Sequence, residues 1–208
     1  EAPPGPVTGG AQFRLPTLSA AQRKAAEEIR AVFADRATVL LRGVTGSGKT
    51  EIYMHFAAEV LARGGQVLLL VPEIALTPQM MAKFTAYFGE NVAMLHSGLQ
   101  LTERYDQWKR IRRGDVRVVL GTRSAVFAPL PDLGLIIMDE EQEHTYKSDQ
   151  NPKYHARDVA RFRCAQEKAL LLLASATPSL ESFRKAEEGK YTLIALRHRF
   201  GNAHLPAV

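Results

Sequence analysis

The sequence lacks the cysteine pairs typical of secreted proteins and the long apolar runs typical of membrane-spanning proteins. Cys164 is the only cysteine in 208 residues, which excludes an internal disulfide and a cysteine-based zinc site. We expect it to be a small apolar residue on a helix. No apolar run approaches the roughly 18 residues of a membrane span. The first ten residues, with three prolines and three glycines, are too polar for a signal peptide, so we expect a soluble cytoplasmic protein without a membrane partner.

Positive charge is in excess, and it is distributed unevenly. The chain has 27 lysines and arginines against 22 acidic residues, which gives a formal net charge of +5. Seven bases and two acids lie between Arg104 and Arg123, so this segment alone accounts for the excess. A concentrated group of bases is typical of a surface that binds a polyanion. A solvated helix face would produce the same pattern, and the charge alone does not distinguish the two.

Short apolar runs alternate with helical patterns after a linker at residues 1–17, and a linker at the first residue suggests a piece of a longer protein. Strands are predicted at residues 38–42, 66–71, 92–95, 116–121, 133–139 and 169–174, with 191–196 as a possible seventh. Because these runs are apolar throughout, both faces of the sheet should be covered. The pattern predicts one α/β domain over residues 18–208, with a mostly parallel central sheet and helices on both faces.

Several predicted helices begin at residues that cap helices. Ser19 and Gln22 have the spacing of a capping box. Thr77 and Thr177 each precede a proline directly after a strand, the order expected for an N-cap and the first helical residue. Gln22 has a second possible role, because its amide can both donate to and accept from the edge of an adenine. The spacing does not choose between these two roles.

The helix predicted over residues 101–113 carries much of the positive charge. One stripe of this helix is apolar and consists of Leu101, Tyr105, Trp108 and Ile111. We therefore expect Trp108 to lie in the core and the arginines of the helix to face outward.

A phosphate-binding pattern follows the first predicted strand. The segment "GVTGSGKT" fits G-x-x-x-x-G-K-[ST], and its residues are Gly43, Val44, Thr45, Gly46, Ser47, Gly48, Lys49 and Thr50. Glycines allow successive backbone N–H groups to point at phosphate oxygens, and the N-terminus of the following helix adds positive potential. Lys49 would reach the β- and γ-phosphates, and Thr50 would bind Mg²⁺. The segment predicts a P-loop NTPase that binds ATP and Mg²⁺.

A pair of acids closes the strand predicted at residues 133–139. Asp139 would hold the water shell of the metal, and Glu140 would orient or deprotonate the water that attacks the γ-phosphate. An acid next to the metal ligand favours hydrolysis over phosphate transfer to a second substrate. We expect the tips of two neighbouring strands to place Lys49, Asp139 and Glu140 in one cavity.

Five segments, taken together, resemble motifs I, Ia, Ib, II and III of superfamily 2 helicases. They are "GVTGSGKT", "VPEIALTPQ", "GTRSAVFAP", "DEEQ" and "SATPS", in that order. The phrases "EIALTPQ", "KYHARD" and "LSAAQRKA" are similar, over roughly residues 14–200, to the first helicase lobe of the primosomal replication-restart helicases. The resemblance implies a RecA-like lobe of a 3′-to-5′ DNA helicase that acts at stalled or repaired forks. It also implies single-stranded and forked DNA, primosome proteins and single-stranded DNA-binding protein as partners, near the bacterial nucleoid.

The same resemblance assigns roles to individual residues. It implies that Gln22 contacts adenine and that Thr77, Thr122 and Arg123 contact the backbone of single-stranded DNA. Ser175 and Thr177 would link hydrolysis to movement.

The loop after the acid pair resembles an aromatic-rich loop that senses DNA. Rings that stack on bases suit a protein that must ignore sequence, because every base has a face. The residues of this predicted sensor are His144, Tyr146, Lys147, Lys153, Tyr154 and Arg157. Tyr146 and Tyr154 could instead be packing residues that only support the next helix.

Two departures from the family pattern affect what we expect. Gln142 stands where the family usually has a histidine; its amide can still hydrogen-bond to Ser175 or Thr177, but it cannot titrate. The motifs of a second helicase lobe, including its arginine, do not occur in this sequence. Since such an arginine can contribute about 10³–10⁵ in rate, we expect the isolated chain to bind nucleotide weakly and to hydrolyse it very slowly.

Two other functions would also fit the phosphate-binding pattern. A superfamily 2 motor that acts on RNA or is coupled to transcription would have similar motifs. A P-loop switch module would use its nucleotide state to control a protein partner, and nucleic acid would not stimulate it.

Overall fold

The computed structural model describes residues 15–35, 38–44 and 46–196. In these residues seven strands form one sheet, in the order β3-β4-β2-β5-β8-β1-β9, and all of its strand pairs are parallel. The strands are β1 (Thr38–Gly43), β2 (Gln66–Leu70), β3 (Val92–Leu95), β4 (Val118–Gly121), β5 (Leu133–Met138), β8 (Leu170–Ser175) and β9 (Tyr191–Leu196). The parallel sheet is therefore confirmed, and so is its seventh strand. Residues 1–14 of the predicted linker lie outside the described residues.

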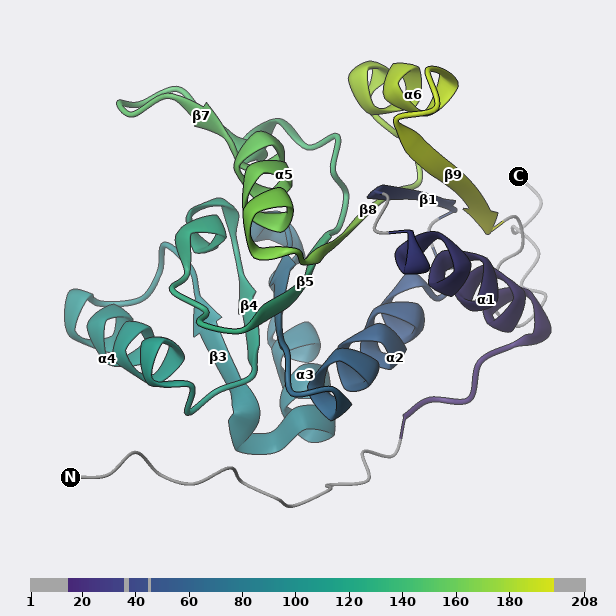
Figure 1. Cartoon of the computed structure of the whole chain (residues 1–208). Helices are drawn as coiled ribbons and strands as arrows, with labels where there is room; N and C mark the ends of the chain where they lie inside the picture. Colours follow the sequence, from purple (N-terminus) through teal and green to yellow (C-terminus); the bar gives the residue numbers. More distant parts are fainter. Residues whose placement is uncertain (1–14, 36–37, 45, 197–208) are drawn as a thin grey trace, which may run out of the picture.

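Helices cover both faces of this sheet, as the sequence predicts (Figure 1). They are α1 (Ala20–Ala34), α2 (Lys49–Ala62), α3 (Pro78–Phe88), α4 (Leu101–Arg113), α5 (Ala156–Glu167) and α6 (Leu180–Glu187). Short 3₁₀ helices are η1 (Glu73–Ala75), η2 (Gly89–Asn91), η3 (Arg123–Phe127) and η4 (His144–Tyr146). A small antiparallel hairpin joins β6 (Lys147–Ser148) to β7 (Tyr154–His155). No helix in the described ranges is long and apolar enough to span a bilayer.

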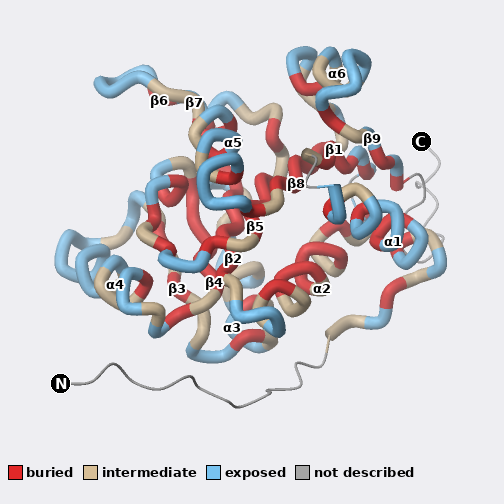
Figure 2. Tube along the Cα trace, in the orientation of Figure 1, coloured by how far each residue is buried: buried red, intermediate tan, exposed pale blue. Residues whose placement is uncertain are grey.

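Successive residues of the central strands point into two hydrophobic clusters, one on each face. In β1, Val39 and Leu41 pack with residues of α1, α2 and α3, whereas Leu40 packs with residues of α5. Figure 2 shows the central strands as the most deeply buried part of the molecule. Full burial of one such side chain contributes about 1.5–3 kcal/mol. Cys164 of α5 belongs to the second cluster, and burial raises the pKa of its thiol to about 12.

The start of β4 differs from the prediction, which began this strand at residue 116. The strand begins at Val118, and the side chain of the preceding Arg117 turns to the end of α2. Its guanidinium donates hydrogen bonds to the carbonyl oxygens of Leu61 and Gly65, at 3.4 and 3.1 Å. Arg117 is thus a structural base and does not belong to the exposed positive surface.

The apolar stripe predicted on α4 is mostly exposed. Only Ile111 is buried, whereas Leu101, Tyr105 and Trp108 have exposed fractions of 82%, 56% and 37%. The reason is the position of the helix, which lies beside β3, a strand of four residues at the edge of the sheet (Figure 1). An edge strand this short gives the helix little surface to cover. The prediction that Trp108 lies in the core is therefore wrong.

A buried ion pair fixes the loop that follows β5. The carboxylate of Glu141, which is fully buried, accepts hydrogen bonds from Arg157 at 2.8 Å, from the hydroxyl of Ser182 at 2.8 Å and from the backbone N–H of Ser179 at 2.7 Å. Arg157 also pairs with Glu181 on α6. Burial opposes the charge of Arg157, but the hydrogen bond and the charge of Glu141 outweigh it and leave the pKa of the guanidinium raised. The loop is thereby tied to α5 and α6.

This arrangement contradicts the prediction that Arg157 belongs to a DNA sensor. Its side chain is only 3% exposed and is occupied by two carboxylates. A base in that position cannot reach a phosphate group outside the domain.

We predict that Glu141→Gln lowers the free energy of unfolding by about 3–5 kcal/mol, because it leaves the buried charge of Arg157 with only the exposed carboxylate of Glu181 as a partner. Glu181→Gln is a matched control, since it removes the other carboxylate of the same arginine. That carboxylate is 58% exposed, so its loss should cost less than about 1 kcal/mol. Urea denaturation measures both values. Equal losses would contradict the assignment of Glu141 as the essential partner.

Candidate nucleotide-binding site

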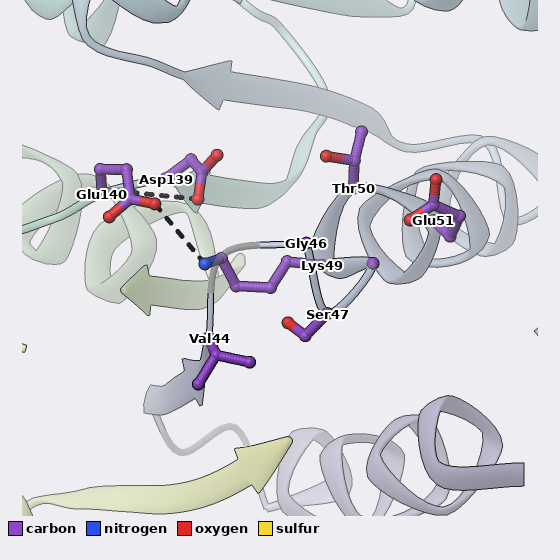
Figure 3. A pocket seen from close by; sticks show the side chains of 9 residues that line it. Val44, Gly46, Ser47, Lys49, Thr50, Glu51, Asp139 and Glu140 are labelled. Carbon is purple, nitrogen blue, oxygen red and sulfur yellow. Dashed lines mark hydrogen bonds and ion pairs between the residues drawn. The ribbon is translucent and has the colours of Figure 1, made fainter. Parts of the chain in front are cut away.

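The sheet order places the carboxyl ends of β5, β8 and β1 side by side. β1 and β5 are separated by β8, so the expectation that they are direct neighbours is wrong, although their tips still face one cavity. This cavity measures about 380 Å³, and it is lined by Val44, Gly46, Ser47, Gly48, Lys49, Thr50, Glu51, Asp139 and Glu140 (Figure 3). The parallel direction of the strands explains the result, because all their carboxyl ends lie at the same edge of the sheet.

The turn from β1 to α2 depends on a glycine at position 48. Gly48 is the N-cap of α2 and has a φ of 82°, in the region that favours glycine. A Cβ atom there would lie 2.0 Å from the side-chain nitrogen of Gln22. Both the backbone conformation and the close approach of α1 therefore require glycine at this position. Thr45, which was predicted to bind the nucleotide, lies outside the described residues.

Lys49 joins the two strand ends through its ammonium group. Its Nζ donates a hydrogen bond of 2.8 Å to the carbonyl oxygen of Gly43 and lies 3.5 Å from Oε1 of Glu140. The side chain is only 9% exposed. This buried ammonium lies beside an open cavity. A phosphate group bound in the cavity could therefore replace the carbonyl oxygen and the carboxylate as its partners.

Two tyrosines hold Asp139, and the sequence did not predict either contact. The hydroxyl of Tyr53, on α2, donates to Oδ1 of Asp139 at 2.7 Å. The hydroxyl of Tyr146 donates to the backbone carbonyl oxygen of Asp139 at 2.6 Å. Burial raises the pKa of the Asp139 carboxyl, and the hydrogen bond from Tyr53 opposes this rise. Burial also raises the pKa of both tyrosines well above the usual value, so they remain hydrogen-bond donors.

The position of Tyr146 contradicts the prediction that its ring stacks on DNA bases. Its side chain is fully buried, and η4 places it against the end of β5. In this conformation it can transmit a movement of the loop to Asp139, but it has no free face for a base. Burial is the outcome expected if Tyr146 is a packing residue, the alternative that the sequence left open.

Glu140 begins a chain of polar contacts that ends at Thr177, in the loop between β8 and α6. The N-cap of α6 is Ser179, so the prediction that Thr177 caps this helix is wrong. Its backbone φ of 46° is in the left-handed region, an uncommon conformation for a residue with a side chain. Oε2 of Glu140 accepts a hydrogen bond from the amide of Gln142 at 3.0 Å, and Ser175 donates to Oε1 of Gln142 at 2.5 Å. The backbone N–H of Thr177 then donates to Oγ of Ser175 at 2.9 Å. The predicted contact between Gln142 and Ser175 is confirmed.

Gln22 acts as a cap in this structure and also contacts the phosphate-binding turn. Its Oε1 accepts a hydrogen bond of 2.7 Å from the backbone of Ser19, which completes the capping box on α1. Its Nε2 donates to the carbonyl oxygen of Gly48 at 3.1 Å. With its side chain buried and both ends of the amide occupied, Gln22 would have to release a partner before it could bind an adenine.

The polar groups of the cavity fit a phosphate and a metal ion. Thr50, in the first turn of α2, and Asp139, after β5, both line it, and a hydroxyl and a carboxylate are oxygen ligands of the kind that Mg²⁺ prefers. Oγ of Ser47 is buried, and within the described part of the chain it has no hydrogen-bond partner. Buried polar atoms are normally satisfied, so this hydroxyl is a candidate contact for a ligand of the turn.

A second pocket, of about 200 Å³, lies on the same edge of the sheet. Its lining residues are Val71, Pro72, Glu73, Ser97, Thr122, Arg123, Ser124 and Thr145. Nη1 of Arg123 donates to the carbonyl oxygens of Thr145 and Lys147, at 3.2 and 2.8 Å. Its Nε is buried and, among the residues described, has no partner. Thr122 is also buried. The hydroxyls of the lining residues and the guanidinium of Arg123 could bind an anion. We call this pocket the Arg123 pocket.

The remaining predicted DNA contacts lie in different surroundings. Thr77 is exposed, and its hydroxyl accepts a hydrogen bond from the backbone of Met80, which caps α3. Tyr154, on β7, packs edge-to-face against Phe127 with ring centroids 4.9 Å apart. Phe127 is 54% exposed, and the sequence did not single it out.

Comparisons with known proteins agree with this geometry. Residues 19–186 match the DEAD/DEAH box helicase family. The replication restart protein PriA of Bacillus subtilis is 48% identical over 193 residues, which is 92% of this chain and 24% of that protein. PriA of Synechocystis is 46% identical over 200 residues, which is 94% of this chain and 24% of that protein. The chain thus spans about a quarter of the length of these relatives.

Solved helicase structures have the same fold. RecG bound to a three-way DNA junction superimposes with a TM-score of 0.64 and 25% identity, over 91% of this chain and 25% of RecG. The helicase MrfA bound to DNA gives a TM-score of 0.61 at 17% identity, over 88% of this chain and 27% of MrfA.

We predict that Tyr53→Phe makes stability more sensitive to pH. Because the pKa of Asp139 is raised in the folded state, that state binds the proton more tightly, and the free energy of unfolding falls as pH rises from the ordinary carboxyl pKa through the raised one. Removing the Tyr53 hydroxyl raises this pKa further. At neutral pH without divalent metal the variant should lose about 1.5–3 kcal/mol, and in acid less.

Tyr146→Phe is the control, because the hydroxyl of Tyr146 binds the backbone carbonyl of Asp139 and not its carboxylate. Its loss should cost about 1 kcal/mol at every pH. Urea unfolding of both variants across a pH series measures the difference. Parallel stability curves for the two variants would contradict the role given to Tyr53.

Proposed function

The chain belongs to the DEAD/DEAH box helicase family, and we propose that it is the ATP-binding lobe of an ATP-dependent DNA helicase. The observation that carries this proposal is the cavity shared by Lys49, from the turn after β1, and the acids Asp139 and Glu140, after β5. An ammonium, a hydroxyl and two carboxylates around one cavity form the set of groups that binds and cleaves a nucleoside triphosphate.

Nucleotide binding requires Lys49 to change partners. The γ-phosphate replaces Gly43 and Glu140 as the partner of its ammonium, which leaves the Glu140 carboxylate free. Thr50 and Asp139 hold Mg²⁺, which neutralises charge on the phosphate oxygens when it is bound. Val44, Gly46, Ser47 and Gly48 form the cradle for the phosphates, and Gln22 contacts the adenine after it releases Gly48 or Ser19.

Glu140 then orients the attacking water and accepts its proton. Gln142 fixes one oxygen of this carboxylate, and Ser175 in turn fixes Gln142. A change in the charge of Glu140 during hydrolysis therefore alters the series of hydrogen bonds that ends at Thr177, in the loop before α6. This chain of contacts supports the proposal that Gln142, Ser175 and Thr177 couple hydrolysis to movement.

The DNA is proposed to lie across the Arg123 pocket. Thr77 follows β2, and Thr122 and Arg123 follow β4. Because these two strands are adjacent in the sheet, we expect the contacts of the three residues with the DNA backbone to form one continuous path. Tyr146 sits below this path: Arg123 holds the carbonyl groups on both sides of it, and its hydroxyl holds Asp139. A phosphate that draws Arg123 away would loosen this connection. The proposed surface for bases is Tyr154 with Phe127, the last residue of the 3₁₀ helix that begins at Arg123.

The biological role rests on the similarity to PriA, of which this chain covers about a quarter. We propose a 3′-to-5′ helicase that acts at stalled or repaired replication forks and takes part in primosome assembly. Its proposed partners are single-stranded and forked DNA, primosome proteins and single-stranded DNA-binding protein. The proposed location is the bacterial cytoplasm, at the nucleoid.

We predict that ATP hydrolysis by the complete protein is stimulated by single-stranded DNA and that two substitutions separate binding from chemistry. Lys49→Ala should abolish nucleotide binding and hydrolysis together. Glu140→Gln should keep nucleotide binding but slow hydrolysis by about 10²–10⁴. Binding of a fluorescent ATP analogue and phosphate release measure the two steps.

Lys190→Ala is the matched control, because this lysine is 66% exposed and far along the chain from the turn; it should leave both steps unchanged. Stimulation by RNA but not by DNA would replace the proposal with an RNA motor. The absence of stimulation by any nucleic acid, with nucleotide binding intact, would favour a P-loop switch module.

A further inference from the structure

The outer face of α4 exposes more apolar surface than the packing of the domain accounts for. Leu101, Tyr105 and Trp108 follow one another at spacings of four and three residues, which places them on one stripe, and their exposed fractions are 82%, 56% and 37%. Figure 2 shows this helix as largely exposed at the edge of the molecule. We call these three residues, together with Lys109 and Arg112, the α4 face.

Each aromatic ring of the α4 face carries a cation. Nζ of Lys109 lies 4.1 Å from the centre of the Tyr105 ring, and Cζ of Arg112 lies 5.3 Å from the centre of the Trp108 ring. Arg104 and Arg113 are also exposed on this helix. The acids of α4 are fewer, and one of them, Glu103, is occupied by the backbone N–H of Gln100 at the start of the helix. The surface is thus aromatic and positively charged.

A surface of rings paired with cations matches the chemistry of a nucleic acid single strand. Such a strand presents flat bases that stack on rings and phosphates that attract the cations. A duplex hides the faces of its bases, and an acidic peptide offers charge without flat faces. Charge complementarity together with the rings therefore favours single-stranded DNA as the occupant.

The α4 face also continues the proposed path of the DNA. Ser97, near the start of the loop between β3 and α4, lines the Arg123 pocket. Nη2 of Arg104 lies 3.5 Å from the carbonyl oxygen of Ser97, which ties the first turn of α4 to that loop. β3 is next to β4 at the sheet edge, and α4 lies beside it (Figure 1). Single-stranded DNA that leaves the Arg123 pocket on the side of β3, the edge strand, would therefore meet the α4 face next.

We propose that the α4 face binds the segment of single-stranded DNA that extends beyond the Arg123 pocket, with bases stacked on Tyr105 and Trp108. The proposal rests on the proposed function, because it needs DNA in that pocket. It adds a second stretch of contact, outside the nucleotide site and outside the helicase motifs.

Trp108 makes this contact directly measurable, because it is the only tryptophan of the chain. Its fluorescence should be unchanged by short oligothymidylates that fill only the Arg123 pocket. Longer oligothymidylates should quench it and should bind about tenfold more tightly for each added stacking contact. A quencher attached to one end of a long oligonucleotide should act, and the same quencher on the other end should not, because a path has a direction.

Tyr105→Ser should reduce the affinity for long oligothymidylates about tenfold and leave the affinity for short ones unchanged. The matched control is Phe162→Ser, which removes an aromatic ring that is 66% exposed on α5 and should alter neither affinity. Both side chains are exposed, so neither substitution removes core packing.

The outcomes separate this inference from the proposed function. If short and long oligothymidylates bind equally and Trp108 emission stays constant, the α4 face is not a DNA surface, although the Arg123 pocket remains one. Quenching by polyglutamate but not by DNA, or equal quenching from both ends of the oligonucleotide, would also overturn the inference. If no oligothymidylate binds at all, the DNA path of the proposed function fails, and the inference fails with it.

Discussion

The ammonium group of Lys49 lies between the ends of two strands, and the geometry of the candidate site depends on this contact. It binds the carbonyl oxygen of Gly43 at the end of β1 and faces Glu140 after β5. The strands come from distant parts of the chain and are separated by β8, so only a parallel sheet in this order brings their ends together. A positive charge held by such exchangeable partners is ready to accept a phosphate group, and its transfer would free Glu140 for chemistry.

The segment after β5 connects the phosphate-binding turn to the rest of the domain, because its four polar residues together contact α2, η4, α5, α6 and the end of β8. Asp139 is held by Tyr53 of α2 and by Tyr146 of η4. Glu140 faces the phosphate-binding turn, Glu141 is locked to α5 and α6, and Gln142 binds Ser175 at the end of β8. The locked member, Glu141, gives the segment a fixed point against which its neighbours can move. This loop therefore consists of three acids and an amide because each of these residues has its own hydrogen-bond partners.

The sequence predicted the parts of this site that local chemistry determines. The phosphate-binding turn, the acids that close β5 and the contact of Gln142 with Ser175 could be predicted because spacing and hydrogen-bonding capacity restrict the possibilities. The tyrosines could not, since Tyr53 in an apolar helix is indistinguishable from any core residue until its hydroxyl meets Asp139. Trp108 was wrongly predicted to be buried, because helical periodicity cannot reveal that α4 lies against a short edge strand. Arg157 looked like a surface base for a similar reason, as its partner Glu141 comes from another element.

The central claim is that Lys49 and the acids after β5 bind one triphosphate together, and a crystal structure with Mg²⁺ and a non-hydrolysable ATP analogue tests it most directly. The account predicts that Nζ of Lys49 leaves the carbonyl of Gly43 for a phosphate oxygen and that Asp139 faces the metal while it keeps its hydrogen bond from Tyr53. A nucleotide bound away from the ends of β1 and β5, or a Lys49 that remains on Gly43 while the phosphates lie elsewhere, would contradict it.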